Sequence, residues 1–125
     1  MKQLGKSTED YLETIFLLSK RLKDVRSVDI AHEMGFSKPS VSIAVKKLRS
    51  DGHIEVNEFG YILLTEQGAT QARRVWDRHR TIYLWLLSLG VSEQNAEIDA
   101  CNIEHIISEE TFLAVRQKLM TDLEP

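Results

Sequence analysis

The sequence lacks the features that mark several common classes of protein. Its 125 residues include a single cysteine, Cys101, so no intramolecular disulfide can form and a disulfide-stapled secreted domain is excluded. No apolar run approaches the roughly 18 residues that a membrane span needs. The N-terminus turns acidic without the apolar core of a signal peptide. We therefore expect a soluble cytoplasmic chain with no membrane partner, built as one domain or as two small modules sharing a helix.

The chain also has no overall excess of basic charge. Its net charge is −3 and its pI is about 5.8, which taken alone is not typical of a nucleic-acid-binding protein. The charges are unevenly distributed, however. Residues 1–90 hold 14 Lys and Arg against 11 Asp and Glu, whereas residues 91–125 hold 2 against 8. A mildly basic front is thus joined to an acidic back, an asymmetry that leaves nucleic acid open as a partner.

Apolar periodicity and turn signals predict six helices and two short strands. We expect helices over residues 7–22, 28–34, 38–50, 65–89, 92–107 and 108–123, and strands over residues 53–57 and 61–65. In the first helix we expect Ser7 or Thr8 to be the cap and the buried stripe to be Leu12, Ile15, Phe16, Ser19 and Leu22. The fold class is mostly α: a winged helix-turn-helix module over residues 1–70, then an all-helical dimerisation module over residues 71–125.

The winged helix-turn-helix prediction depends on the spacing of three residues. Ala31 is small enough for two crossing helices to approach, Gly35 permits the sharp turn between them, and Val41 fills the junction. Two strands joined by a tight turn follow, as a wing would. On this interpretation the helix over residues 38–50 enters the major groove of DNA.

Charge and side-chain chemistry support that interpretation. Residues 37–50 carry four cations and no acid, which is the electrostatic footprint that phosphate contacts require. The candidate DNA contacts are Ser37, Lys38, Pro39, Ser40 and Ile43 for base edges, and Ser42, Lys46 and Lys47 for phosphates. The alternative is a solvated surface helix with a chance run of lysines. The predicted wing fits less well, because it carries Glu55 and Glu58 and no Lys or Arg.

A second group of residues has the chemistry of metal ligands. Cys101, Glu104 and His105 are spaced to share one face of the fifth helix, where thiolate, carboxylate and imidazole form part of a coordination shell. Asp10 and Glu13 form a second such pair on the first helix, and His79 projects from the fourth. Each has an ordinary structural explanation when taken alone. If the first helix packs between the fourth and fifth, all six side chains can meet.

The segments that carry a family resemblance span nearly the whole chain. They are Ser7-Thr-Glu-Asp-Tyr-Leu-Glu-Thr-Ile-Phe16, Ser37-Lys-Pro-Ser-Val-Ser42, Leu64-Thr-Glu-Gln-Gly68, Arg78-His-Arg80 and Cys101-Asn-Ile-Glu-His105. With them the sequence resembles the iron-dependent repressor and manganese-transport-regulator family, of the diphtheria-toxin-repressor type. The resemblance implies a homodimeric, metal-activated transcriptional repressor whose second half is the dimerisation domain. It also implies a short form without the SH3-like C-terminal domain of longer members.

The resemblance implies a hybrid set of metal ligands. Asp10 and Glu13 match manganese-type members, and Cys101 matches iron-type members, since the manganese type has glutamate there. The other three expected ligands, common to both types, are His79, Glu104 and His105. Two ancillary iron-type positions differ, with Tyr83 in place of glutamate and Glu97 in place of histidine. We therefore expect Mn²⁺ or Fe²⁺ as the cofactor, with Zn²⁺ or Co²⁺ binding in vitro because a thiolate favours softer ions.

The expected mechanism is a bound ion that restricts the movement of the two modules, so that a homodimer presents two recognition helices to a palindromic double-stranded operator. The apolar residues that support dimerisation are Trp85, Leu86, Leu89, Ile98, Ile103, Ile106, Ile107, Phe112 and Leu113. One alternative is a winged-helix regulator that responds to a small organic ligand without metal. Another is a metallohydrolase, which the absence of a nucleophile–base pair or phosphate loop disfavours.

Overall fold

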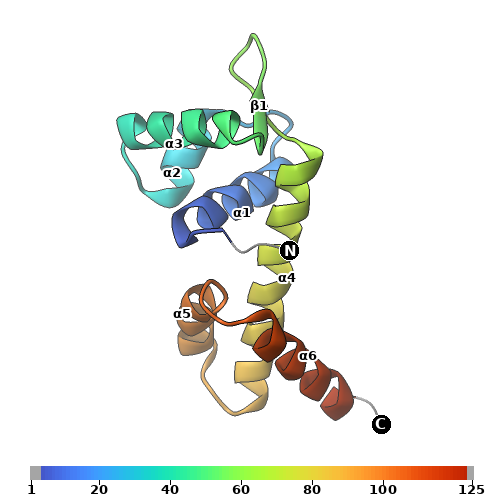
Figure 1. Ribbon diagram of the computed structural model, residues 1–125. Helices are drawn as coiled ribbons and strands as arrows, with labels where there is room; N and C mark the ends of the chain where they lie inside the picture. The colour runs from blue at the N-terminus through green and yellow to red at the C-terminus, as the bar shows by residue number, and fades with distance from the viewer. Residues whose placement is uncertain (1–3, 124–125) are drawn as a thin grey trace. The chain divides into compact units, whose positions relative to one another are not determined.

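The computed structural model describes residues 4–123, and within them it contains six helices and one two-stranded sheet (Figure 1). The elements are α1 (Lys6–Arg21), α2 (Ser27–Met34), α3 (Lys38–Ser50), β1 (Ile54–Val56), β2 (Ile62–Leu64), α4 (Glu66–Ser88), α5 (Glu93–Ile103) and α6 (Glu109–Leu123). The expected fold class, mostly α with a small β-wing, is confirmed. The chain divides into two compact units at Arg73 and Arg74, within α4. The N-terminal Met1-Lys2-Gln3 segment lies outside the described residues.

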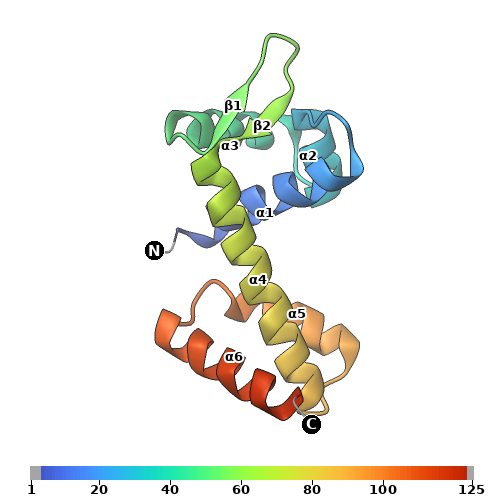
Figure 2. The same ribbon diagram turned by 90° about the vertical axis from the view of Figure 1, so that its right-hand side faces the viewer.

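The first unit packs α1, α2 and α3 around one apolar core, with the β-hairpin beside them (Figures 1 and 2). The helix α3 has the predicted bounds and buries Val41, Val45 and Leu48, with Ala44 half-buried beside them. Its opposite face is exposed along its whole length. A helix with one buried and one solvent-facing side is held by the core while its outer surface stays available for contacts.

The turn between α2 and α3 has the predicted construction. Gly35 ends α2 in the left-handed conformation (φ 69°, ψ 28°), which a residue with a side chain rarely adopts. Ala31 and Val41 are both buried at the junction. The Ser37 hydroxyl oxygen accepts a hydrogen bond from the Ser40 amide at 3.3 Å and caps α3. The sharp turn therefore fixes the angle at which α3 leaves α2.

The β-hairpin is shorter than predicted. Its strands pair antiparallel from Ile54 with Leu64 to Val56 with Ile62, whereas the sequence predicted residues 53–57 and 61–65. Asn57 and Thr65, at the ends of the predicted strands, make other hydrogen bonds. The Asn57 side-chain oxygen accepts from two amides of the turn, and the Thr65 hydroxyl caps α4 by accepting from the Gly68 amide at 3.1 Å. Local turn and cap bonds therefore take the residues at both ends of the predicted strands.

The predicted cap of α1 is wrong. Gly5 occupies the capping position, and no side chain caps the helix. Ser7 and Thr8 lie inside the first turn instead. A side chain of the helix binds the backbone that precedes it: the Leu4 amide donates a hydrogen bond to the Glu9 carboxylate at 3.2 Å. An acidic side chain in the first turn thus binds an amide that precedes the helix.

The predicted buried stripe of α1 is correct in its centre and wrong at its C-terminal end. Leu12 and Ile15 are fully buried and Phe16 is half-buried, but Ser19 and Leu22 are exposed. Leu18 is buried in their place, because the stripe follows three-residue spacing from Ile15. The Ser19 hydroxyl instead donates to the Ile15 carbonyl at 2.7 Å, as serine often does within a helix.

The second unit contains the rest of α4 with α5 and α6, and its apolar core joins α4 to α5. The buried core residues are Ile82, Leu86, Ala96 and Ala100. The two alanines are fully buried in this core. Of the apolar residues expected at a dimer interface, Leu86 and Phe112 are buried, whereas Leu89, Ile98, Ile106 and Leu113 are at least half exposed.

The predicted extension of α5 to residue 107 is wrong. The helix begins after a Ser92 cap and ends at Ile103, so Glu104 and His105 lie in the turn that follows. The buried Arg78 accounts for this end. Its guanidinium donates to the carbonyl oxygens of Glu104 (3.1 Å) and Ile107 (2.6 Å). Because these carbonyls accept hydrogen bonds from a side chain, they do not need the amides of a further helical turn. The chain can therefore turn towards α6.

In the part of the chain that the structure describes, no helix has the length and apolar character that crossing a bilayer requires.

The close approach of α4 to the loop before β1 gives a testable prediction. A methyl group at Gly68 would overlap the carbonyl oxygen of His53. We expect Gly68→Ala to lower the free energy of unfolding by about 1–3 kcal/mol, the usual cost of overpacking. Urea unfolding at fixed protein concentration measures this change. Helix propensity alone gives the opposite sign, a gain of up to about 1 kcal/mol, so a more stable variant would contradict the close approach.

Candidate metal centre and nucleic-acid interface

The outer face of α3 carries every residue that the sequence predicted to contact DNA. All of these side chains are exposed in the structure: Ser37, Lys38, Pro39, Ser40, Ser42, Ile43, Lys46 and Lys47. Ile43 is 71% exposed, although the opposite face of the same helix is apolar and buried. An exposed isoleucine between cations is suited to contact a thymine methyl group while its neighbours bind phosphates.

A pocket of about 260 Å³ lies between the N-terminal part of α1 and the middle of α3. Its lining includes the hydroxyl-bearing Ser7, Thr8 and Ser40, and also Lys47. Hydroxyl and ammonium groups of this kind commonly contact the DNA backbone. The first turn of α1 therefore adds polar groups beside α3 that the sequence analysis did not assign to DNA contact.

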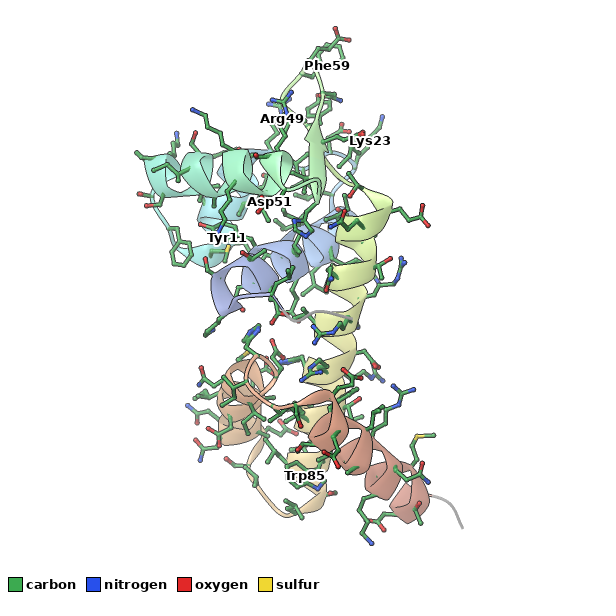
Figure 3. The ribbon with its side chains drawn as sticks, viewed as in Figure 1. Tyr11, Lys23, Arg49, Asp51, Phe59 and Trp85 are labelled. Carbon is green, nitrogen blue, oxygen red and sulfur yellow. The ribbon has the colours of Figure 1, made fainter. Side chains whose placement is uncertain are left out.

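Arg26, a cation that the sequence pattern did not place near the hairpin, lies against it. The Arg26 guanidinium lies over the Tyr61 ring at 4.9 Å from its centroid and donates to the Tyr61 hydroxyl at 3.1 Å. Phe59, at the tip of the hairpin in Figure 3, lies beside the same ring with centroids 5.8 Å apart. Because 35 residues separate Arg26 from Tyr61, no local pattern in the sequence predicts their contact.

His79 is the centre of the polar cluster in the second unit. Its Nδ1 lies 2.8 Å from Glu104 Oε2, and its Nε2 lies 3.1 Å from Glu97 Oε1. The rings of Trp76 and Tyr83, one turn before and one turn after it on α4, are stacked against its two sides. The imidazole is therefore fixed in orientation by two carboxylates and two aromatic rings.

Cys101 brings a sulfur donor to the same imidazole. Its Sγ lies 3.8 Å from His79 Nδ1. The hydrogen bond with Cys101, followed by that with Glu104, raises the pKa of His79 to about 11, against the opposing effect of burial. At neutral pH the imidazole is therefore protonated. A metal ion has to displace that proton to bind the ring, so its affinity falls as the pH falls.

The turn after α5 carries the other two donors predicted in this unit. Glu104 and His105 are both buried, and Glu104 Oε1 lies 3.2 Å from His105 Nε2. Arg78 positions this turn by binding its carbonyls. The remaining guanidinium nitrogen pairs with Glu109 at 3.2 Å, and the Phe112 ring lies against the guanidinium at 5.0 Å. In the sequence, Arg78 stands out only as part of the Arg78-His-Arg80 motif, which gives no sign of this structural role.

Asp10 and Glu13, the two donors predicted in the first unit, both lie on α1. They are three residues apart, and both are half-buried. The Asp10 carboxylate accepts from the Lys6 ammonium at 2.9 Å. The pair thus belongs to the same compact unit as α3, the predicted recognition helix.

Comparison with protein families identifies both halves of the chain. The iron dependent repressor N-terminal DNA binding domain matches residues 3–59, and the iron dependent repressor metal binding and dimerisation domain matches residues 65–121. The chain belongs to the iron-dependent repressor family. Membership confirms the function class expected from the sequence, which is that of metal-dependent, DNA-binding transcriptional repressors with a divalent metal cofactor. The family consists of regulators and not of enzymes.

Individual relatives agree with this family assignment. The transcriptional regulator MntR of Escherichia coli O157:H7 is 38% identical over 108 residues, which cover 86% of this chain and 70% of the relative. The solved structure of the manganese regulator SloR is 30% identical with a TM-score of 0.81, covering 96% of this chain and 55% of that one. A manganese-dependent transcriptional repressor in complex with manganese is 25% identical with a TM-score of 0.82, at 90% and 52% coverage. The chain thus spans about half the length of these two solved structures.

The role of Arg78 gives a prediction for this repressor. Arg78→Lys keeps the charge but loses the planar fork that reaches three acceptors. We expect its affinity for a divalent ion to fall roughly 10–100-fold, as when an outer-shell partner is lost. Competition with a chelating dye measures the affinity, and circular dichroism verifies the helix content. Glu109→Gln, which changes only the exposed acceptor, is the matched control. Unchanged affinity in a folded Arg78→Lys protein would contradict the positioning role.

Proposed function

We propose that this chain is a metal-activated repressor in which residues 1–70 bind DNA and residues 71–125 bind metal and form the dimer. A repressor of this kind acts in the cytoplasm, where its operator is. The observation that carries the proposal is the donor group around His79 in the second unit, where its Nδ1 lies 2.8 Å from Glu104 Oε2 and 3.8 Å from Cys101 Sγ. An exposed, acid-free cationic face on α3 supplies the second requirement, a surface for DNA.

The proposed ligand set combines donors from both units: Asp10, Glu13, His79, Cys101, Glu104 and His105. Its carboxylate oxygens and imidazoles suit Mn²⁺ or Fe²⁺. The Cys101 thiolate shifts the relative affinities towards softer ions, so Zn²⁺ or Co²⁺ binds more tightly in vitro than the ion that acts in the cell. The support is the chemistry of the donors and the family of metal-dependent repressors to which the chain belongs.

The proposed coupling follows from where the ligands lie along the chain. Asp10 and Glu13 belong to the unit that contains α3, whereas His79, Cys101 and Glu104 belong to the other unit. When bound to donors of both units, the ion supplies a link that restricts their relative movement. The coupling is reciprocal, so operator DNA raises the affinity for metal by the same factor by which metal raises the affinity for the operator.

The proposed DNA target is a palindromic double-stranded operator. In a homodimer, two copies of α3 would face successive major grooves, about 34 Å apart. The exposed apolar side chains of the second unit, including Leu89, Ile98, Ile106 and Leu113, support the dimer because a two-fold interface would cover them. Five residues at the N-terminal end of α3 are proposed to reach base edges: the cap Ser37, Lys38, Pro39, Ser40 and Ile43. The proposed phosphate contacts are Ser42, Lys46 and Lys47.

The link between the two units is tested by Glu13→Ala. We expect it to abolish the metal-induced gain in operator affinity, which for allosteric coupling is of the order of 5–150-fold, because α1 loses an oxygen ligand. Fluorescence anisotropy of a labelled operator, with chelator and with Mn²⁺, measures the gain.

The matched control is Glu33→Ala, which removes an exposed glutamate of α2 from the same unit. It should keep the full gain. A Glu13→Ala protein that Mn²⁺ activates as strongly as the wild type would count heavily against the shared ion.

The role of α3 is tested by Lys47→Ala. Removing one phosphate contact should weaken binding to every DNA sequence alike and lower the slope of log affinity against log salt by about one unit. Lys118→Ala on α6 removes the same charge from the other unit and should leave that slope unchanged. Equal slopes for wild type and Lys47→Ala would exclude Lys47 as a phosphate contact.

A further inference from the structure

The tip of the β-hairpin carries an exposed aromatic ring on the side of the first unit where α3 lies. Phe59 is 67% exposed and stands at the tip of the loop between β1 and β2 (Figure 3). In both ribbon views α3 lies above α1, and the hairpin projects beyond α3 in the same direction (Figures 1 and 2). A duplex bound to the outer face of α3 therefore lies beside the hairpin tip.

Hydrogen bonds within the turn fix the position of Phe59. The Asn57 side-chain oxygen accepts from the Phe59 amide at 2.9 Å and from the Tyr61 amide at 3.0 Å. The Gly60 amide donates to the Asn57 carbonyl oxygen at 3.0 Å, and Gly60 has a φ of 78°, which lets the chain reverse direction there. A turn that is already ordered loses less conformational entropy when it binds a partner.

The hairpin is also attached to the segment that precedes α2. Tyr61 lies between the Phe59 ring, at 5.8 Å between centroids, and the Arg26 guanidinium, at 4.9 Å from its own centroid. The Ile62 amide donates to the Val25 carbonyl oxygen at 2.7 Å. Phe59 is thus supported by the body of the first unit although its ring faces solvent.

The charge of the hairpin does not favour a contact with phosphates. Residues 54–64 carry two exposed acids, Glu55 and Glu58, and no Lys or Arg. Two cations from neighbouring segments offset these acids: Arg26 lies over Tyr61, and Arg49 of α3 lines the same pocket as Glu55. With no excess of positive charge, the hairpin gains little from phosphates. The exposed ring is the feature of the tip that is suited to DNA.

We propose that Phe59 is an apolar wedge that enters the minor groove beside the α3 site and selects a base step that opens easily. Proteins that bind the minor groove frequently insert an apolar side chain between neighbouring base pairs, which unstack and kink there. Pyrimidine–purine steps such as TA are the most easily kinked. Phe59 then reads DNA through its deformability, outside the base pairs that α3 contacts. The inference rests on the proposed function, because it needs α3 to bind duplex DNA.

The first test compares two substitutions at the same exposed position. Phe59→Ala removes the wedge, and we expect it to lower the affinity for a palindromic duplex from the chain's own upstream region roughly 5–150-fold, as when one aromatic contact with a base is lost. Phe59→Leu keeps an apolar wedge and should retain most of the affinity. Fluorescence anisotropy with Mn²⁺ present measures both, and circular dichroism verifies the fold.

The salt dependence distinguishes a wedge from a phosphate contact. Phe59→Ala should leave the slope of log affinity against log salt unchanged, because no counterion is released at an apolar contact. A slope that falls by about one unit in Phe59→Ala would contradict the apolar contact.

The choice of base step is tested with two duplexes that share their half-sites and differ only in the flanking base pairs. One has TA steps beside each half-site, and the other has stiff A-tracts there. We expect the wild type to prefer the TA duplex by about fivefold or more, and Phe59→Ala to bind both equally. Equal binding of both duplexes by the wild type would overturn the inference. So would undiminished affinity in Phe59→Ala, which would leave the exposed ring to a protein partner.

The same titrations with chelator in place of Mn²⁺ separate this inference from the proposed function. If Mn²⁺ raises the affinity of the wild type but Phe59→Ala binds as tightly, the wedge is wrong and the proposed function stands. If Phe59→Ala loses affinity but Mn²⁺ changes the affinity of neither protein, the wedge stands and metal activation is wrong.

Discussion

The metal-binding half of the molecule depends on the interaction of one buried cation, Arg78, with the turn between α5 and α6. A buried guanidinium is tolerated only when its donors are satisfied. Here they bind two backbone carbonyls of the turn and the carboxylate of Glu109. These bonds end α5 at Ile103 and hold Glu104 beside His79, the next residue along α4 from Arg78. One side chain thereby satisfies its own charge and positions the acid next to the histidine.

The choice of metal in this family member is a competition between oxygen and sulfur donors. Glu97 and Glu104 approach different nitrogens of the His79 ring, while Cys101 adds a thiolate near the same imidazole. A hard ion gains most from carboxylates and a softer ion from the thiolate. In the proposed ligand set, an ion that does not recruit Asp10 would supply no link to the first unit. The proposal therefore treats the affinity for an ion and the activation of DNA binding as separate quantities.

The sequence predicted the first unit well, because its features are local. The bounds of α3, the left-handed Gly35 and the buried Val41 all follow from spacing within about ten residues. The cap of α1 was wrong, because Gly5 takes that position without a side-chain bond. The predicted C-terminal end of the second strand was also wrong, because the Thr65 hydroxyl caps α4.

The sequence indicated which residues have the chemistry of metal ligands, but it did not predict correctly the structural elements on which all of them lie. The spacing of Cys101 and Glu104 indicated metal chemistry, but the extension of α5 through Glu104 was wrong, because helical periodicity does not register bonds from Arg78, 26 residues away. Glu97 was noted only as a departure from a histidine of relatives. Its spacing of four residues from Cys101 was the available signal, whereas its approach to His79 depends on the packing of α5 against α4.

The central claim is that a divalent ion controls DNA binding. The most direct measurement is the affinity of the metal-stripped full chain for a palindromic duplex from its own upstream region. It is made with chelator and with Mn²⁺, anaerobic Fe²⁺, Zn²⁺ and Co²⁺ in parallel. We expect a rise in affinity of the order of 5–150-fold with Mn²⁺ or Fe²⁺. Equal affinity with chelator and with every ion would contradict it and leave a winged-helix protein that binds DNA without a metal signal.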